Sequence, residues 1–470
     1  MSLFSLAAAD GAPQLFRFEN KGYLGLHGAV MFRCPSILCG CAIAFHLLCA
    51  VSDSVAADAA WWPHWRGPQA NGVVASGNPP LTWSATENVR WITQIPGKGA
   101  STPIVVDDHL FVVSAVATGR RPEHPPVKHP DARTEPPNQL YRFLLIALNR
   151  HSGDVLWQKV IVEESPHEGH HRTNTYAGGS PVTDGKRLYV SLGSRGVYAF
   201  DLEGNRLWGR QLGRMRTRRG WGEASTPGLH EDHLVVPWDQ EDQSWLFDLD
   251  VASGKIRWRI PRDEPSNWST PVFVPQDGEI QVIVNGTNRS RGYRLQTGES
   301  IWECGVLSVN AIPTPIFDDQ RIYCMSGYRK SIIYAIFRGA KGDVTDTDRM
   351  AWTFNRHTPY VASPLLYQGR LYMTKGLGSR LSILDPKTGH PLVEAEPLQG
   401  LSNVYASPVG VNGHVYIVDR EGNTAVLRAG DSLDLVGVNR INDTVDASPV
   451  VIGDRLYLRS WSAVYCFAND

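Results

Sequence analysis

Short runs in which apolar and polar residues alternate, separated by tight turns, fill the chain from about residue 80 to its end. Residues 181–208 are typical. They contain the runs 181–183, 188–192, 197–200 and 207–208, with Asp184-Gly185 at the first break. Alternation with a period of two predicts half-buried strands, and Asp-Gly breaks favour hairpins. The pattern therefore predicts units of four short antiparallel strands.

A Ser-Pro or Thr-Pro pair precedes each of these units and sets their spacing. From the second pair onward the prolines are 41 to 49 residues apart, which fits one four-stranded blade and exceeds one solenoid turn. The pairs are Thr102-Pro103, Ser180-Pro181, Thr226-Pro227, Thr270-Pro271, Thr314-Pro315, Ser363-Pro364, Ser407-Pro408 and Ser448-Pro449. We therefore predict an all-β protein, an eight-bladed β-propeller of four-stranded antiparallel blades.

A second marker repeats near the end of the units, where a tryptophan follows a turn glycine by four residues. The pairs are Gly153 with Trp157, Gly204 with Trp208, Gly254 with Trp258, and Gly298 with Trp302. Trp91 and Trp352 occupy the same place in an outer strand. Glycine permits the positive φ of a tight turn, and a large ring can fill the wedge between blades. We expect these tryptophans to be structural.

The eighth unit is one strand short. After Ser448-Pro449 the chain has room only for strands at 455–458 and 463–467 before it ends. Residues 88–92 have the pattern of an outer strand and no inner partners of their own. A closed ring leaves no exposed sheet edge between its first and last blades. We therefore expect this N-terminal strand to complete the last blade.

The start of the chain has the features of an export leader. Arg33 precedes an uncharged stretch at 34–51, and Ser54-Val55-Ala56 is a small-x-small cleavage site. Counted from Met31, these are the proportions of a signal peptide, and residues 1–30 are then a mis-assigned upstream start. If Met1 is the correct start, the uncharged stretch 34–51 is instead a short membrane anchor. We divide the chain into a leader (1–56), a Trp-rich segment (57–80) and the propeller (81–470), and expect a periplasmic or otherwise exported protein.

Composition narrows the classes of partner. The chain has 46 basic and 47 acidic residues, a formal net charge of −1, so no overall field attracts nucleic acid or an anionic membrane. We expect a monomer that binds no nucleic acid and is not an integral membrane protein once the leader is removed.

Cys304, Cys324 and Cys466 lack metal or redox spacing, and we expect them to be small buried residues.

The repeat resembles the pyrroloquinoline quinone (PQQ) type of propeller repeat, apolar-Ala-x-Asp-x-x-Thr-Gly-x-x-x-Trp. Residues 198–208 and 295–302 follow it, and 384–389 follow it but end in Leu392. The resemblance covers roughly residues 80–470. It is specific for fold. It does not specify the function, because similar proteins include both BamB-like assembly scaffolds and members of the quinoprotein alcohol dehydrogenase-like superfamily. Residues 61–68 resemble a segment common in envelope propellers of this family, and we expect them to pack on the ring.

The lengths of the connections predict that one face of the ring is elaborated. Connections between the first and second strands are two- or three-residue turns such as Asp184-Gly185. Nearly all long insertions fall in connections that open on the other face. They are a proline-rich segment (117–140), a histidine-rich segment (163–179), an arginine-rich segment (213–222) and the segment 238–243. Variable loops on a rigid scaffold usually carry binding, so we expect binding on this face.

Two clusters in these segments have chemistry with more than one interpretation. His167, Glu168, His170 and His171 are zinc or copper ligands by type, but no regular element fixes their spacing, so a solvated loop is the competing interpretation. The arginine-rich segment holds four guanidinium groups that suit a carboxylate, phosphate or acidic partner. These are Arg214, Arg216, Arg218 and Arg219.

A third set lies just before the Ser/Thr-Pro pairs, where the innermost strands begin and an axial funnel should open. These residues combine flat aromatic rings with a few polar groups, as in a pocket for a planar quinone or a sugar. Packing around a water-filled channel is the alternative interpretation. The set comprises Tyr176, Trp221, Glu223, Trp268, Asn310, Tyr360, Tyr405 and Asp446.

The favoured function is that of an exported cell-envelope propeller, a non-catalytic binding or scaffold module for a protein or glycan. The alternative is a PQQ-dependent quinoprotein dehydrogenase that oxidises alcohols or sugars. That resemblance implies a quinone stacked on tryptophan, calcium held by Glu and Asn, and a catalytic Asp. Glu223, Asn310 and Asp446 have suitable chemistry, but the adjacent-cysteine pair of the alcohol-oxidising branch is absent. PQQ with calcium is thus the cofactor that this alternative requires.

Overall fold

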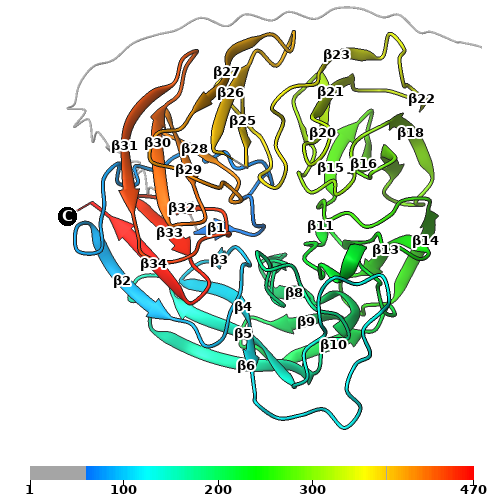
Figure 1. The fold of residues 1–470 in the computed structure, drawn as a ribbon, viewed down its shortest axis with the longest axis vertical. Helices are drawn as coiled ribbons and strands as arrows, with labels where there is room; N and C mark the ends of the chain where they lie inside the picture. Colours follow the sequence, from blue (N-terminus) through cyan, green and yellow to red (C-terminus); the bar gives the residue numbers. More distant parts are fainter. Residues whose placement is uncertain (1–59, 377, 470) are drawn as a thin grey trace, which may run out of the picture. The chain divides into compact units, whose positions relative to one another are not determined.

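A computed structural model of the protein describes residues 60–376 and 378–469, and the predicted leader lies outside these residues. The described residues form eight sheets that follow one another around a ring (Figure 1), and their strands pair antiparallel except for the short β22 beside β18. The prediction of an all-β, eight-bladed propeller is therefore confirmed. Within the described ranges, no helix is long and apolar enough to cross a membrane.

The first four blades occupy the chain from β1 to β18. Blade 1 contains β1 (Trp61–Trp62), β3 (Ile104–Val106), β4 (His109–Ala117), β5 (Tyr141–Asn149) and β6 (Val155–Glu164). Blade 2 contains β7 (Val182–Thr183), β8 (Arg187–Ser191), β9 (Val197–Asp201) and β10 (Arg206–Arg210), with the 3-10 turn η1 (Gly193–Arg195) between β8 and β9. Blade 3 follows η2 (Arg218–Gly220) and contains β11 (Gly228–His230), β12 (His233–Trp238), β13 (Ser244–Asp250) and β14 (Ile256–Arg262). Blade 4 contains β15 (Val272–Gln276), β16 (Glu279–Val284), β17 (Arg289–Arg294), β18 (Ser300–Gly305) and β22 (Gly342–Asp343).

The last four blades complete the circle. Blade 5 contains β19 (Ile316–Phe317), β20 (Arg321–Ser326), β21 (Ile332–Phe337) and β23 (Met350–Phe354). Blade 6 contains β24 (Leu365–Tyr367), β25 (Arg370–Lys375), β26 (Arg380–Leu384) and β27 (Pro391–Pro397). Blade 7 contains β28 (Val409–Val411), β29 (His414–Val418), β30 (Asn423–Arg428) and β31 (Asp434–Arg440). Blade 8 contains β32 (Val450–Ile452), β33 (Arg455–Arg459), β34 (Ala463–Ala468) and β2 (Val89–Gln94).

The N-terminal strand β2 closes the ring, as predicted. It pairs antiparallel with β34 and places Trp91 opposite Cys466 and Ile92 opposite Tyr465. The outermost strand of the last blade therefore comes from the beginning of the propeller. Because β2 pairs with β34, the outer edge of β34 is not left as a free strand edge to which another chain could add.

The hydroxyl residues of the Ser/Thr-Pro pairs form a belt of hydrogen bonds around the axis. The Thr102 N–H donates to Ser180 Oγ at 2.9 Å, and the Ser448 N–H donates to Thr102 Oγ1 at 2.9 Å, so the belt returns to its start. A small hydroxyl residue is needed at this position because the neighbouring backbone N–H requires an acceptor. Seven of the eight donor-to-acceptor steps are present in the described structure, all but 226 to 270: they are 102 to 180, 180 to 226, 270 to 314, 314 to 363, 363 to 407, 407 to 448 and 448 to 102.

Replacing Ser407 by alanine is expected to lower the free energy of unfolding by about 1–3 kcal/mol, because the buried Ser363 N–H loses its acceptor at 2.8 Å. Ser407→Thr keeps a hydroxyl and should retain most of the stability. Guanidinium unfolding of both variants checks this prediction. Equal stability of the two variants would show that the belt hydrogen bond contributes nothing.

The tryptophans of the repeated Gly-Trp pattern contact the neighbouring blade. The indole Nε1 of Trp208 in blade 2 donates to the Val251 carbonyl of blade 3 at 2.9 Å. A Cβ added to Gly254 of blade 3 would lie 2.5 Å from the same indole ring. Each glycine thus makes room for the tryptophan of the preceding blade rather than its own. The same contact joins Trp91 to Gly153, Trp157 to Gly204, Trp258 to Gly298, and Trp352 to Gly389.

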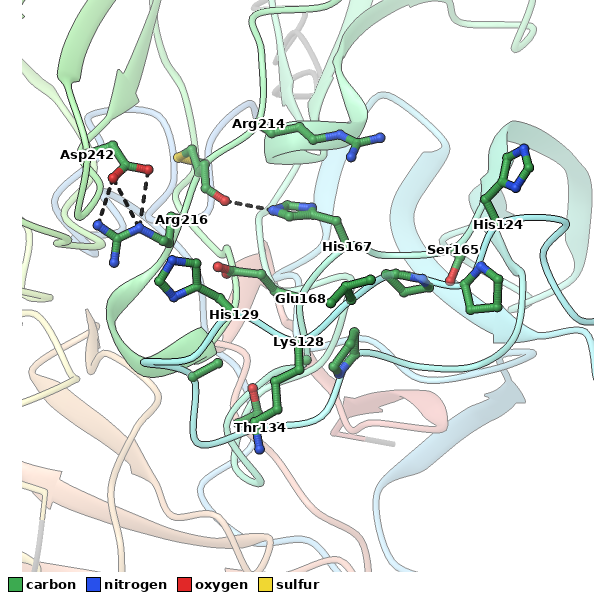
Figure 2. A pocket seen from close by; sticks show the side chains of 17 residues that line it. His124, Lys128, His129, Thr134, Ser165, His167, Glu168, Arg214, Arg216 and Asp242 are labelled. Carbon is green, nitrogen blue, oxygen red and sulfur yellow. Dashed lines mark hydrogen bonds and ion pairs between the residues drawn. The ribbon is translucent and has the colours of Figure 1, made fainter.

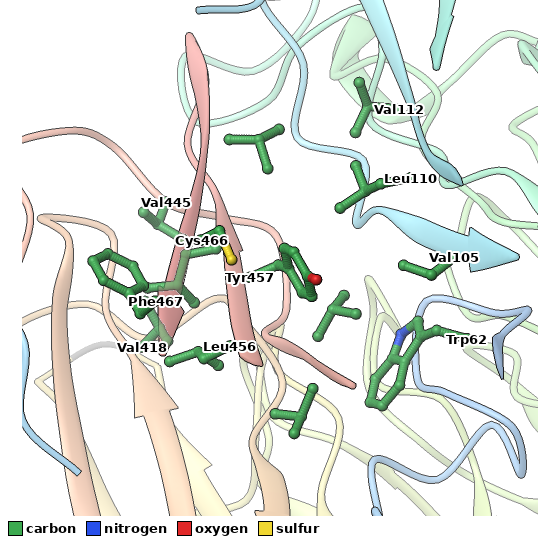
Figure 3. Close-up of a cluster of buried hydrophobic side chains, with 14 of the residues drawn as sticks. Trp62, Val105, Leu110, Val112, Val418, Val445, Leu456, Tyr457, Cys466 and Phe467 are labelled. Carbon is green, nitrogen blue, oxygen red and sulfur yellow. The ribbon is translucent and has the colours of Figure 1, made fainter. Parts of the chain in front are cut away.

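The segment 60–83, called here the N-terminal segment, packs on the ring. Trp62 is 1% exposed and lies opposite Val105 through the pairing of β1 with β3. Trp83 stacks on Tyr416 of blade 7. Figure 3 shows Trp62 in one buried cluster with side chains of blades 1, 7 and 8. The cluster includes Cys466, and all three cysteines of the propeller are buried and free, as expected.

The N-terminal segment contacts the short turns of the ring. The Asn78 N–H donates to Asp454 Oδ1 at 3.0 Å, and the Asn412 amide donates to Asn78 Oδ1 at 2.9 Å. Asp454 and Asn412 belong to turns between the first and second strands of blades 8 and 7. The N-terminal segment therefore covers part of the face opposite the long connections.

Candidate functional site

A cavity of about 380 Å³ lies where the innermost strands begin. Every blade contributes to its lining the residue that stands two positions before the hydroxyl residue of its Ser/Thr-Pro pair. This repeated offset places the cavity on the propeller axis. The eight residues are Ala100, Gly178, Ala224, Trp268, Ile312, Val361, Tyr405 and Asp446. We refer to it as the axial cavity.

The wall of the axial cavity is asymmetric. Blades 1 to 3 contribute only Ala100, Gly178 and Ala224, so the wall is recessed there. The histidine-rich segment supplies residues 171–174 on this side, and the arginine-rich segment supplies Trp221. Tyr328 and Tyr360 also line the cavity, with their rings stacked at a centroid distance of 4.8 Å.

The structure brings five of the eight predicted funnel residues to the axial cavity: Trp221, Trp268, Tyr360, Tyr405 and Asp446. Tyr176 and Glu223 instead line a neighbouring recess beside Arg195. Asn310 is buried behind the wall at 1% exposure. Its side chain lies beside Tyr360, whose pKa is raised to about 12 by burial, an effect that Asn310 opposes.

Several lining residues were absent from the sequence-based set. A fixed offset from the Ser/Thr-Pro pairs would have found Ala100, Gly178, Ala224, Ile312 and Val361. No repeat signal marks residues 171–174 or Tyr328, because connections of irregular length bring them to the cavity. Their position depends on tertiary structure.

Glu223 is held in a buried ion pair. Its Oε2 accepts hydrogen bonds from the Ser194 N–H at 2.8 Å and from Arg195 Nη2 at 2.9 Å. Its Oε1 accepts from the Ser194 hydroxyl. The side chains of Arg195 and Glu223 are each 5% exposed. Both carboxylate oxygens are therefore already used within the protein.

Asp446 lies on the cavity wall but is also neutralised. Arg420 Nε donates to its Oδ1 at 2.5 Å, and Trp461 Nε1 donates to its Oδ2 at 2.7 Å. Burial raises the pKa of Asp446, and Arg420 opposes this effect. The Arg420 guanidinium also lies 4.9 Å from the centre of the Tyr405 ring.

These pairings do not fit the calcium and PQQ expectation. Calcium requires several free oxygen ligands, whereas Glu223 and Asp446 each hold a guanidinium group and Asn310 lies behind the wall. Among the residues that the structure describes, no three His, Cys, Asp or Glu side chains are grouped closely enough to hold a metal ion. The geometry gives no donor set through which a calcium-bound quinone could act.

A second cavity, of about 560 Å³, lies among the long connections, and we call it the loop cleft. Its lining includes His124, Lys128 and His129 of the proline-rich segment together with His167 and Glu168 of the histidine-rich segment (Figure 2). The arginine-rich segment and the segment 238–243 also line it. All four long connections therefore meet on one face of the ring, as predicted.

The two charged motifs do not form compact sites. His167 Nε2 hydrogen bonds to the Met215 carbonyl at 2.7 Å, whereas His171 Nδ1 hydrogen bonds to Thr173 Oγ1 at 2.7 Å, outside the loop cleft. Arg216 is paired with Asp242, with 2.7 Å between Nη2 and Oδ1, while Arg214 is exposed (Figure 2). His167 and His171 thus line two different cavities and His170 lines neither, and only Arg214 and Arg216 of the four arginines line the loop cleft.

Solved structures share the propeller fold. BamB from Moraxella catarrhalis is 14% identical, with a TM-score of 0.52 over 80% of this chain and 100% of that chain. A europium-containing methanol dehydrogenase is 10% identical, with a TM-score of 0.62 over 87% and 98% of the two chains. A quinohemoprotein alcohol dehydrogenase from Comamonas testosteroni is also 10% identical, with a TM-score of 0.62 over 87% and 80%. At these identities the likeness is one of fold alone.

Sequence comparisons identify the family. The chain is 22% identical to the outer membrane protein assembly factor BamB of Yersinia pestis over 333 residues, covering 69% of this chain and 80% of that protein. It is 21% identical to tetrathionate hydrolase of Acidithiobacillus ferrooxidans over 298 residues, covering 58% and 53%. A sequence profile described as outer membrane protein assembly factor BamB matches residues 62–236 and 242–470. Because the profile spans most of the chain, this protein belongs to the BamB-like family of PQQ-type β-propellers.

Proposed function

We propose that this protein is an exported propeller of the cell envelope that holds a partner protein on its long-connection face and catalyses no reaction. The observation that carries the proposal is the gathering of four long connections into the loop cleft. Apart from the connection 338–349 between β21 and β23, the opposite face has short turns, and the N-terminal segment covers part of it. An asymmetry of this kind is typical of a scaffold with one binding face.

The long connections are fastened to one another, which supports a prepared binding surface. The Glu168 carboxylate accepts hydrogen bonds from the N–H and the hydroxyl of Thr217, at 3.1 and 2.6 Å. The Arg133 N–H donates to the Arg219 carbonyl at 2.8 Å. These bonds join the proline-rich, histidine-rich and arginine-rich segments. A surface ordered before binding loses less conformational entropy when a partner binds.

The relatives support the envelope as the place of action. One relative and the matched family are described as outer membrane protein assembly factors, and a scaffold of that kind acts by holding other proteins. Export through the predicted leader and a monomeric propeller are parts of this proposal. The Glu223 and Asp446 pairings favour this function over a PQQ-dependent dehydrogenase, because they leave calcium without ligands.

Replacing residues 121–137 by a short Gly-Ser linker should abolish partner binding while leaving the ring folded. These residues connect β4 to β5 and line the loop cleft, and only loop structure is lost. The measurement is crosslinking in the envelope of the source organism, followed by purification and identification of the attached protein. We expect recovery of that protein to fall by at least about tenfold.

The matched control replaces residues 429–432 by a Gly-Ser linker of four residues. These residues form a turn between β30 and β31 that opens on the opposite face. It should recover the partner as well as the wild type does. Equal recovery with both variants would refute binding at the loop cleft. Saturable uptake of PQQ with calcium, together with dye reduction by alcohols or sugars, would refute the non-catalytic assignment.

A further inference from the structure

We propose that the axial cavity binds an anionic oligosaccharide, a chain of sugars that carry carboxylate or sulfate groups. This inference concerns a different cavity from the loop cleft and goes beyond the partner-holding function. It rests on three properties of the axial cavity: its aromatic wall, its uncharged polar groups and the unmatched positive charge on or beside that wall.

Aromatic rings from five consecutive blades dominate the wall. Trp221 precedes the inner strand of blade 3, Trp268 that of blade 4, and Tyr360 and Tyr405 those of blades 6 and 7, while Tyr328 follows β20 of blade 5. All five side chains are half-buried, so a ring surface remains open to the cavity. Flat aromatic faces pack well against the C–H faces of sugar rings. A pit ringed by such faces suits a saccharide end.

The recessed side of the wall supplies polar groups that suit hydroxyl recognition. Residues 171–174, the sequence His-Arg-Thr-Asn, line the cavity beside the small residues of blades 1 to 3. Burial lowers the pKa of His171, which keeps its imidazole neutral near pH 7. His171 Nδ1 and the Thr173 hydroxyl hydrogen bond to each other, and the Asn174 amide donates to the Trp221 carbonyl and accepts from the Thr175 N–H. His171 Nε2, the second Asn174 N–H and the remaining lone pairs of the Thr173 and Asn174 oxygens supply donors and acceptors for sugar hydroxyls.

Three cations that form no ion pair among the described residues lie on the wall of the cavity or beside its aromatic residues. Arg172 lines the cavity and is exposed, and it has no ion pair within the described part of the chain. The Lys98 ammonium lies 5.5 Å from the centre of the Trp461 ring, and the Arg329 guanidinium lies 5.8 Å from that of Tyr328. Neither of these cations has a carboxylate partner among the described residues. The acid on the wall, Asp446, is already neutralised by Arg420. Unmatched cations around a pocket favour an anionic ligand.

The shape of the cavity favours a saccharide over a peptide. Peptides are commonly bound by addition to a free strand edge or along an extended groove. Here every blade contributes a residue to a pit on the axis, and residues of the irregular connections complete its wall. A calcium-bound quinone is disfavoured by the donor pairing described above. Acidic peptide and PQQ are therefore competing ligands that the experiment must distinguish.

The experiment measures binding of defined probes to residues 57–470 by calorimetry and tryptophan fluorescence. The probes are a galacturonate oligomer, a sulfated dextran oligomer and a neutral maltose oligomer of matched length. We expect at least one anionic probe to bind at least about tenfold more tightly than the neutral probe. Its affinity should fall as salt is raised, because Arg172, Lys98 and Arg329 are exposed and salt screens their charges. The preferred anionic probe identifies the acidic group.

Variants locate the binding site. Trp268→Ala should weaken binding at least about tenfold. Trp268 also hydrogen bonds to the Gly222 carbonyl, so a second variant, Ala224→Trp, fills the recessed side while keeping Trp268. It should abolish binding. Arg172→Gln should weaken binding and reduce its salt dependence. Arg214→Gln, which removes an exposed cation of the loop cleft, is the matched control and should leave the affinity unchanged.

The proposal is overturned if neither anionic probe binds, or if the neutral oligomer binds as tightly. It is also overturned if polyglutamate or PQQ binds more tightly than both anionic sugars, or if Trp268→Ala and Ala224→Trp both leave the affinity unchanged. Failure of the partner-holding function is observed separately, in the crosslinking of the variant that lacks residues 121–137.

Discussion

Replacing Trp91 by alanine is expected to lower the free energy of unfolding of residues 57–470 by about 3–5 kcal/mol, the usual effect of removing a buried tryptophan. Trp91 is 8% exposed and lies on β2, the strand that closes the ring. Its indole Nε1 donates to the Arg150 carbonyl at 3.2 Å, and its ring packs against Gly153 of blade 1. The substitution thus weakens the seam between the last blade and the first.

Ile92→Ala is the matched control, since Ile92 is the next residue of β2 and is 42% exposed. It should change the free energy of unfolding by less than about 1 kcal/mol. Guanidinium unfolding followed by tryptophan fluorescence and circular dichroism measures both variants. If Trp91→Ala is as stable as Ile92→Ala, the pairing of β2 with β34 does not close the ring in solution.

Replacing Asp239 by alanine should also lower the free energy of unfolding by about 3–5 kcal/mol, because it leaves a buried guanidinium group without its counter-charge. Arg262 donates to the Asp239 carboxylate from Nε at 2.8 Å and from Nη2 at 2.9 Å. Both side chains are 0% exposed. Asp239 lies in the segment 238–243, so this ion pair fixes part of the loop-rich face to blade 3.

Two further variants test this explanation. Asp239→Ala combined with Arg262→Met removes both charges and should recover part of the lost stability. Arg356→Gln breaks an exposed ion pair with Glu394 and should leave the unfolding midpoint close to that of the wild type. If the double variant is less stable than Asp239→Ala, the unpaired charge of Arg262 is not the source of the loss.

The predicted site residues were brought together only in part, and charge pairing explains the difference. Glu223 precedes a Ser/Thr-Pro pair like other wall residues, yet it turns toward Arg195, 28 residues earlier in the chain. Asp446 reaches the wall but is paired with Arg420, 26 residues earlier. A spacing rule gives the position of a residue in its blade. It does not give the partner that a neighbouring connection supplies.

The sequence by itself determined the number of blades, the closing strand and the face that carries the long connections. Each of these follows from local periodicity, because strands of a blade pair with their neighbours in the chain and the same unit recurs eight times. Only the tertiary structure decided which residues share a cavity. The aromatic wall, the unpaired Arg172 and the fastened loops of the cleft depend on irregular connections from different blades, whose contacts no repeat encodes.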